Sequence, residues 1–341
     1  AQVSVLKRMW LWSCDGPQWC CGNVRRHAKV TIAQAVQRAS KKQAPSSPGG
    51  SPRPEREAMT PRPFASKHEA DAAGLTAEER LVAAARAGNL KRMAQAVTEI
   101  GNINCVTARG QTLLMLAAAA TNTSAVEAVE FLLKAHATLE CRDQAGWTAL
   151  HHACRNSNTD IVQLFFERSA LLNACTAKGE TALILAAMDG HVEMLRLLLH
   201  LKAAVGKRDN MGRTALYHAS EKGQEDLVKF LLRSSAKTNV QANDGVQPLM
   251  LGVIQQKWKI VEMLLERQAD VNAVDMKGDS VLIYVVRADN IALAEKFLDL
   301  QVDLDHENKQ GQTALHVARS LGHFKIAEML GKRMGVFVGV T

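Results

Sequence analysis

Two adjacent histidines, His151 and His152, are the side chains of this chain best suited to acid–base chemistry, since an imidazole titrates near neutral pH. A catalytic site also needs a nucleophile, a second base or a metal beside them. The sequence contains no Gly-x-Ser-x-Gly, no Gly-x-x-x-x-Gly-Lys-Ser/Thr and no His-Glu-x-x-His pattern. We therefore expect no catalytic constellation and predict that the chain is not an enzyme.

Two other groups have residue types that could hold a metal ion. The first is a set of carboxylates on one expected loop: Asp270, Asp275 and Asp279. The second combines thiols and an imidazole: Cys14, Cys20, Cys21 and His27. Polar residues are the default on a loop, and the cysteine spacing departs from the C-x₂₋₄-C unit of structural zinc sites. We expect neither a metal nor a cofactor, with zinc binding or acylation of the cysteines as the less favoured alternative.

The elements that would position any site repeat with a fixed period. Seven glycines mark it, the first step being 36 residues and the others 33: Gly110, Gly146, Gly179, Gly212, Gly245, Gly278 and Gly311. Two residues after six of them comes a hydroxyl: Thr112, Thr148, Thr181, Thr214, Ser280 and Thr313, with Gln247 in the remaining copy. A fixed period of this length indicates a stack of one supersecondary unit.

One unit, residues 178–209, shows what is repeated. Gly179 ends a loop and Thr181 is a good helix N-cap. Apolar residues then recur at helical spacing on both sides of a break at 189–191. Each unit therefore predicts a loop, a short helix, a turn and a longer helix. Neither helix can bury its apolar face alone, so stacking must supply the core.

The repeated unit resembles the ankyrin repeat. Its residues fit the family pattern D-x-x-G-x-T-x-L-H-x-A most fully in one copy: Asp143, Gly146, Thr148, Leu150, His151 and Ala153. A typical connecting loop, Ala-Asp-Val-Asn-Ala, stands at 269–273. The resemblance covers about residues 76–334. It implies an all-α solenoid of about eight helix–turn–helix repeats with short β-hairpin-like loops, in which His151 is structural and His152 lies at the surface.

Several departures from the family pattern carry structural expectations. The longer first step predicts about three extra residues between the two helices of that copy, near 120–124, which should project as a longer turn. An N-terminal unit without the glycine begins at Thr76 and Glu79, which have capping-box spacing. The apolar end of the chain, 336–340, is expected either to pack on the last repeat or to continue into a longer protein.

Charge and proline divide the chain into two parts. Residues 1–67 hold 12 of the 42 Lys/Arg and 3 of the 34 Asp/Glu, a balance of +9, which leaves 30 and 31 for the rest. Seven of the eight prolines lie before residue 64. We predict a largely disordered basic tail over 1–73, the repeat array over 74–334 and a short tail over 335–341. Within the tail, residues 24–42 could form a basic amphipathic helix.

The resemblance also implies where a partner would bind. In ankyrin arrays the loop tips and the exposed side of the first helices form a concave groove. The positions that match are Arg109, Gln144, Trp147, Arg155, Asn156, Lys178, Glu180, Met188, Asp189, Met211, Arg213, Glu221, Lys222, Val246, Ile254, Met276, Lys277, Asp279 and Arg287. Trp147 and the arginines stand out, because Trp and Arg are common interface anchors.

We therefore expect a non-catalytic scaffold that binds a protein partner through this groove, as a monomer without a small-molecule substrate. One alternative is a regulatory or substrate-recruiting part of a larger enzyme or channel, since the chain begins with Ala1 as a fragment or processed protein does. Another is a targeting adaptor whose 1–67 tail binds an acidic membrane or nucleic acid. The near-neutral array argues against nucleic acid as its own ligand. No apolar run is long enough for a membrane span. We expect an intracellular protein of the cytoplasm, with the nucleus or an organelle as the alternatives.

Overall fold

The computed structural model describes residues 77–100 and 103–335. These residues form eight consecutive pairs of helices. The pairs are α3 (Ala77–Arg86) and α4 (Leu90–Ile100), α5 (Leu113–Ala118) and α6 (Ala125–Lys134), α7 (Ala149–Arg155) and α8 (Thr159–Glu167), α9 (Ala182–Asp189) and α10 (Val192–His200), α11 (Ala215–Lys222) and α12 (Glu225–Arg233), α13 (Pro248–Ile254) and α14 (Trp258–Glu266), α15 (Val281–Arg287) and α16 (Ile291–Asp299), and α17 (Ala314–Ser320) and α18 (Phe324–Met334). This arrangement confirms the predicted helical solenoid.

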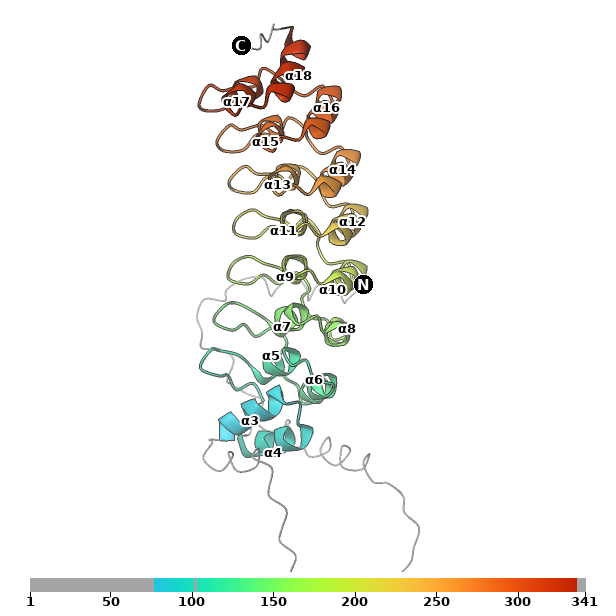
Figure 1. Cartoon of the computed structure of the whole chain (residues 1–341). Coiled ribbons are helices and arrows are strands. Elements are labelled where there is room, and N and C mark those ends of the chain that lie inside the picture. Colours follow the sequence, from blue (N-terminus) through green and yellow to red (C-terminus); the bar gives the residue numbers. More distant parts are fainter. Residues whose placement is uncertain (1–76, 101–102, 336–341) are drawn as a thin grey trace, which may run out of the picture.

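The pairs stack in one direction along the chain. Figure 1 shows the odd-numbered helices, here called the first helices, in one column and the even-numbered second helices in a parallel column. Each helix packs against its own partner, each first helix packs against the next first helix, and most second helices pack against the next second helix. The connections that precede the first helices project away from the second column, and we call them fingers.

The first helices are apolar on almost every side because they lie between neighbours. In α9 all residues from Ala182 to Ala187 are buried. Five of these helices start at a hydroxyl that also caps them: the Oγ atoms of Thr112, Thr181, Thr214, Ser280 and Thr313 accept a hydrogen bond from a backbone N–H three residues later. Such a cap is worth about 1 kcal/mol in a typical helix. Small alanines then allow the helices to approach one another.

The second helices have one buried face and one exposed face. In α10 the buried residues are Met194, Leu195 and Leu198, while Glu193 and Arg196 are exposed. The apolar residues fall at helical spacing and face the stack, as the periodicity predicts. The core is therefore a continuous layer between the two columns, because each pair buries its apolar face only against its neighbours.

Each finger is joined to the next by backbone hydrogen bonds. Ala177 N donates to Ala145 O at 3.0 Å, and Lys309 N donates to Lys277 O at 3.2 Å. Within three fingers an isolated antiparallel bridge precedes the first helix, as between Cys175 and Thr181. The expected hairpin-like loops are thus present, and the ladder of bonds between them holds the tips in a fixed row.

The two irregular units follow the sequence closely. The first unit, which lacks the repeat glycine before its first helix, forms α3 and α4, with the turn between them at Gly88 and Asn89. The longer turn lies at 119–124, between α5 and α6. It is tied to its neighbours, since Asn122 Nδ2 donates to Arg86 O and Asn158 Nδ2 donates to Ala120 O. Thr76, the predicted basic tail with its helix over 24–42, and the apolar end 336–340 all lie outside the described residues.

Candidate binding surface

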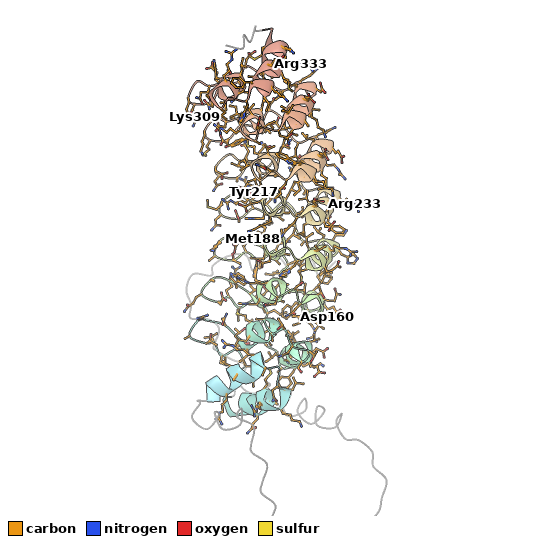
Figure 2. All side chains as sticks on the ribbon, in the orientation of Figure 1. Asp160, Met188, Tyr217, Arg233, Lys309 and Arg333 are labelled. Atoms are coloured by element: carbon orange, nitrogen blue, oxygen red, sulfur yellow. The ribbon has the colours of Figure 1, made fainter. Side chains whose placement is uncertain are left out.

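The face formed by the fingers and the exposed ends of the first helices carries almost all of the predicted contact residues. Figure 2 shows Met188, Tyr217 and Lys309 over this finger face, with Asp160 and Arg233 on the side of the second helices. Exposed members of the predicted set are Arg109, Gln144, Arg155, Lys178, Asp189, Met211, Lys222, Ile254, Met276, Lys277 and Arg287; partly buried members are Trp147, Asn156, Met188, Arg213, Glu221 and Val246.

Two carboxylates of the predicted set, Glu180 and Asp279, are buried, so the expectation that they are exposed is wrong. Thr176 Oγ1 donates to Glu180 Oε2 at 3.0 Å within one finger. Arg287 donates to both carboxylate oxygens of Asp279, and Asn308 Nδ2 donates to one of them at 2.8 Å. The neighbouring finger contributes Asn308 to Asp279, whereas Glu180 is bonded within its own finger, and loop position alone reveals neither contact. They act as internal anchors of the finger face.

His151 and His152 have different hydrogen-bond partners. His151 is fully buried: its Nδ1 is 2.9 Å from Thr148 Oγ1 and its Nε2 is 3.0 Å from Ala174 O, which matches the structural role that the resemblance implies. Burial lowers its pKa to about 4. His152 was expected at the surface, and this is wrong, because its half-buried ring donates from Nε2 to Asp143 Oδ2 at 3.0 Å.

A hollow surrounds Trp147 at the N-terminal half of the finger face. We call it the Trp147 hollow; its lining comes from two fingers and from the ends of α5 and α7: Arg109, Gln111, Ala119, Asp143, Gln144, Ala145, Trp147, His152, Arg155 and Asn156. The Arg155 guanidinium lies 5.2 Å from the centre of the Trp147 ring. A cation in this position is attracted by the face of the indole. The pair places a positive charge over one face of the indole ring.

Hydrogen bonds to Asp143 hold the finger backbone and the His152 ring that line the Trp147 hollow. Asp143 Oδ1 accepts from Ala145 N and Trp147 N, both at 2.9 Å, and its Oδ2 accepts from His152. Burial lowers the pKa of His152 although the Asp143 carboxylate opposes this shift. At neutral pH Asp143 is therefore occupied by neutral donors, and Arg109 and Arg155 supply the charge that faces outward.

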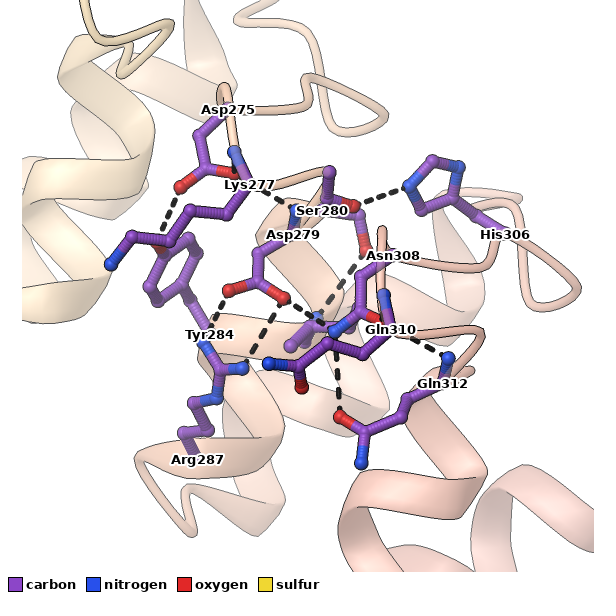
Figure 3. A network of polar contacts seen from close by, with 12 residues as sticks. Asp275, Lys277, Asp279, Ser280, Tyr284, Arg287, His306, Asn308, Gln310 and Gln312 are labelled. Carbon is purple, nitrogen blue, oxygen red and sulfur yellow. Dashed lines mark hydrogen bonds and ion pairs between the residues drawn. The ribbon is translucent and has the colours of Figure 1, made fainter.

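A second hollow lies between the fingers near the C-terminal end of the array. We call it the Arg287 hollow, and its lining residues are Met276, Lys277, Asp279, Arg287, Asn308, Lys309 and Gln310. Figure 3 shows how Asp279 joins Arg287 of α15 to Asn308 of the next finger. Although burial alone would raise the pKa of Asp279, the hydrogen bonds from Arg287 and Asn308 and the arginine charge lower it below its usual value.

A polar pairing that the sequence reasoning missed supports alternate fingers. Where the residue three before the repeat glycine is Asp, the residue six after it is His or Tyr: Asp143 with His152, Asp209 with His218, and Asp275 with Tyr284. The joining distances are 3.0, 3.0 and 2.7 Å. The remaining copies place Leu or Val at the second position: Leu116, Leu185, Leu251 and Val317, all buried. The sequence signal for this pairing is an Asp followed nine residues later by a His or Tyr, whose side chain can donate a hydrogen bond to the carboxylate.

Other chemistry has little support in the described part of the chain. Residues 77–100 and 103–335 contain no group of three or more His, Cys, Asp or Glu arranged to hold a metal ion. Cys154 is buried, and burial raises the pKa of its thiol far above the usual range, which suppresses the thiolate. The cysteine group of the tail lies outside the described residues. Over the same described ranges, none of the helices has both the length and the apolar character needed for a membrane span.

Comparison with protein families gives a match over most of the chain. A family model described as "Ankyrin repeats (3 copies)" matches four overlapping segments: residues 81–174, 168–244, 208–275 and 249–340. The matched segments begin inside α3 and run to the C-terminal end, so together they span the stacked pairs. Comparison with curated proteins produced no match.

Proposed function

Because the chain belongs to the ankyrin repeat family, whose members are protein–protein interaction modules, we propose that it is a scaffold that binds a protein partner through its finger face. The Trp147 hollow carries this proposal. Trp147 and Arg155 are residue types that dominate binding energy at interfaces, and here they form one cation–π pair at the rim of a hollow.

The finger face is also suited to binding because it needs little ordering. The fingers are joined to each other by backbone bonds, and Gln144 Nε2 adds a bond to Ala108 O at 2.9 Å. Asp143 fixes the backbone on both sides of Gly146. A partner that docks on preorganised loops loses less conformational entropy than one that must order them. The function proposed is recognition by a rigid surface, without catalysis by these residues.

An affinity capture from cell extract tests this proposal. We would compare the full chain with Trp147→Ala/Arg155→Ala and with Arg109→Glu/Arg155→Glu, which changes only exposed side chains. The matched control is Lys229→Glu/Arg233→Glu, whose exposed residues lie on the second helix α12. We expect a retained protein that is lost with both finger-face variants and kept with the control. Equal retention by all folded variants would contradict the proposal.

A further inference from the structure

Three cations surround the Arg287 hollow and come from three different places in the fold. Lys277 directly precedes Gly278, and Lys309 lies two residues before Gly311 in the next finger. The two fingers meet at these residues, because Lys309 N donates to Lys277 O. Arg287 is the last residue of α15, at the base of the same space. The hollow has a volume of about 590 Å³, which is room for a few side chains of a bound segment. Figure 3 shows Lys277 and Arg287 on opposite sides of Asp279.

Arg287 is held in place from below. Its Nη1 donates to Asp279 Oδ2 at 2.6 Å and its Nη2 donates to Oδ1 at 3.2 Å. The guanidinium also lies 5.4 Å from the centre of the Tyr284 ring, whose hydroxyl donates to Asp275 Oδ2 at 2.7 Å. A guanidinium has about five N–H donors, so this double contact leaves others directed elsewhere. The side chain is thus preorganised and still about 38% exposed.

The charge around the hollow is not balanced. Of its lining residues, Lys277, Lys309 and Arg287 are cationic and only Asp279 is anionic. Asp279 is buried and already accepts from Arg287 and Asn308. Within the described ranges, the ion pairs include neither Lys277 nor Lys309. Met276 adds an apolar side chain that is 63% exposed at the rim.

We propose that the Arg287 hollow binds an acidic segment of a partner protein, with a carboxylate between Lys277, Lys309 and Arg287 and an apolar neighbour against Met276. The proposal rests on the proposed function, because it names the partner chemistry at one end of the same finger face. Charge complementarity selects this occupant. The chain's own residues 1–67 do not fit, since their 12 Lys/Arg against 3 Asp/Glu would be repelled.

The test uses the full chain and a defined probe, a fluorescein-labelled peptide Gly-Glu-Leu-Glu-Glu-Leu-Glu-Gly. Its binding is measured by fluorescence anisotropy beside a peptide with Gln in place of every Glu. Lys277→Gln/Lys309→Gln removes two exposed cations of the hollow. Lys259→Gln/Lys296→Gln is the matched control, because these exposed lysines lie on α14 and α16 on the other side of the array. A photoreactive version of the probe maps the bound site by mass spectrometry.

We expect the Glu peptide to bind, to crosslink within 276–310, and to lose affinity roughly fivefold in the hollow variant and less than about twofold in the control. Affinity should also fall as salt is raised from about 50 to 300 mM. Equal binding of the Gln peptide, crosslinks confined to 1–67, or unchanged affinity in the hollow variant would overturn the proposal. None of these outcomes depends on the Trp147 hollow. The affinity capture with the Trp147 variants therefore tests the proposed function independently of this peptide assay.

Discussion

Asp143 Oδ2 lies 3.0 Å from His152 Nε2, nine residues further along the chain, and the same relationship joins Asp209 to His218 at 3.0 Å. Each Asp also accepts two backbone N–H groups of its own finger through Oδ1. The pair therefore ties the tip of a finger to its first helix. The next copy, which lies between Asp209–His218 and Asp275–Tyr284, instead places Ala242 and Leu251 in one small apolar cluster.

A double-mutant cycle on Asp209 and His218 tests whether this pairing contributes to stability. His218→Leu should leave a buried carboxylate without its ring donor, and Asp209→Ala should leave a buried imidazole without its acceptor. We expect each to lower the free energy of unfolding by about 1–3 kcal/mol. The double variant, which imitates Ala242 and Leu251, should lose less than the sum. Strict additivity in urea unfolding would show that the pair is not coupled.

His151 gives a pH dependence with a definite sign. Its native pKa of about 4 lies below the unfolded value of 6.5, so the unfolded chain binds the extra proton between these pH values. The stabilisation that neutral His151 gives to the folded state is fully retained above about pH 6.5 and is lost as the pH falls towards 4. The cost approaches roughly 2–3 kcal/mol at the lower end, since one pKa unit is about 1.4 kcal/mol.

The measurement for His151 is urea unfolding of wild type and His151→Met at pH 7 and near pH 4.5. Met is chosen because Met115 and Met250 stand at the equivalent position of other copies. Between pH 7 and pH 4.5, we expect the free energy of unfolding to fall less in the variant than in the wild type. The effects of all other titrating groups are common to both proteins and cancel in this comparison. An equal loss in both proteins would show that His151 does not titrate as its burial implies.

Gly146 has a backbone and a neighbour that exclude a side chain. Its φ is +74°, and a Cβ would lie 2.5 Å from Ala177 N of the next finger. Gly146→Ala should therefore destabilise by more than the roughly 1 kcal/mol of backbone strain alone. Gly311→Ala isolates the strain, since its φ is +70° with open space around it, and Gly206→Ala has neither feature. The thermal midpoint should be highest for Gly206→Ala, lower for Gly311→Ala and lowest for Gly146→Ala. Any other order would contradict this explanation.

Six of the second helices, α6 to α16, end without a glycine. The residue after each of six second helices and their caps has a positive φ, and none is Gly: His136, Ser169, Lys202, Ser235, Gln268 and Gln301. Gln268 is exposed, so its side chain does little packing. We expect Gln268→Gly to raise the free energy of unfolding by about 0.5–1 kcal/mol, because glycine adopts this conformation without strain. A decrease in the urea concentration at half unfolding would show that the Gln268 side chain is needed there.

The register of the array could be predicted because a glycine marks each of seven fingers and a hydroxyl follows two residues later in six of them. Thr181, for example, caps its helix where the pattern places it. Burial of the finger residues could not be predicted in the same way. Asp279 is covered by Asn308, which lies 29 residues away on the next finger, and His152 is drawn inward by Asp143. These contacts cross the fold, so a pattern within one unit does not report them.

The identity of the contact residues stays a prediction for a related reason. Stacking requires Thr148 at the start of α7 and Leu198 on the buried face of α10. It does not require any particular residue at the positions of Trp147, Arg155 or Lys277. Such surface positions are free to vary on a common frame, and function lies in them. The domain boundaries at 74 and 334 also stay predictions.

Site-specific photocrosslinking from the two faces of one repeat tests most directly whether partners bind the finger face. A photoreactive phenylalanine derivative would replace Ala145, which is exposed in the Trp147 hollow, or Gln163, which is exposed on α8 of the same unit. After irradiation in cell extract, we predict a covalent adduct with one partner protein from position 145 that is absent from position 163 and reduced by Arg109→Glu/Arg155→Glu. Adducts that form equally from both positions, or only from position 163, would contradict recognition through the finger face.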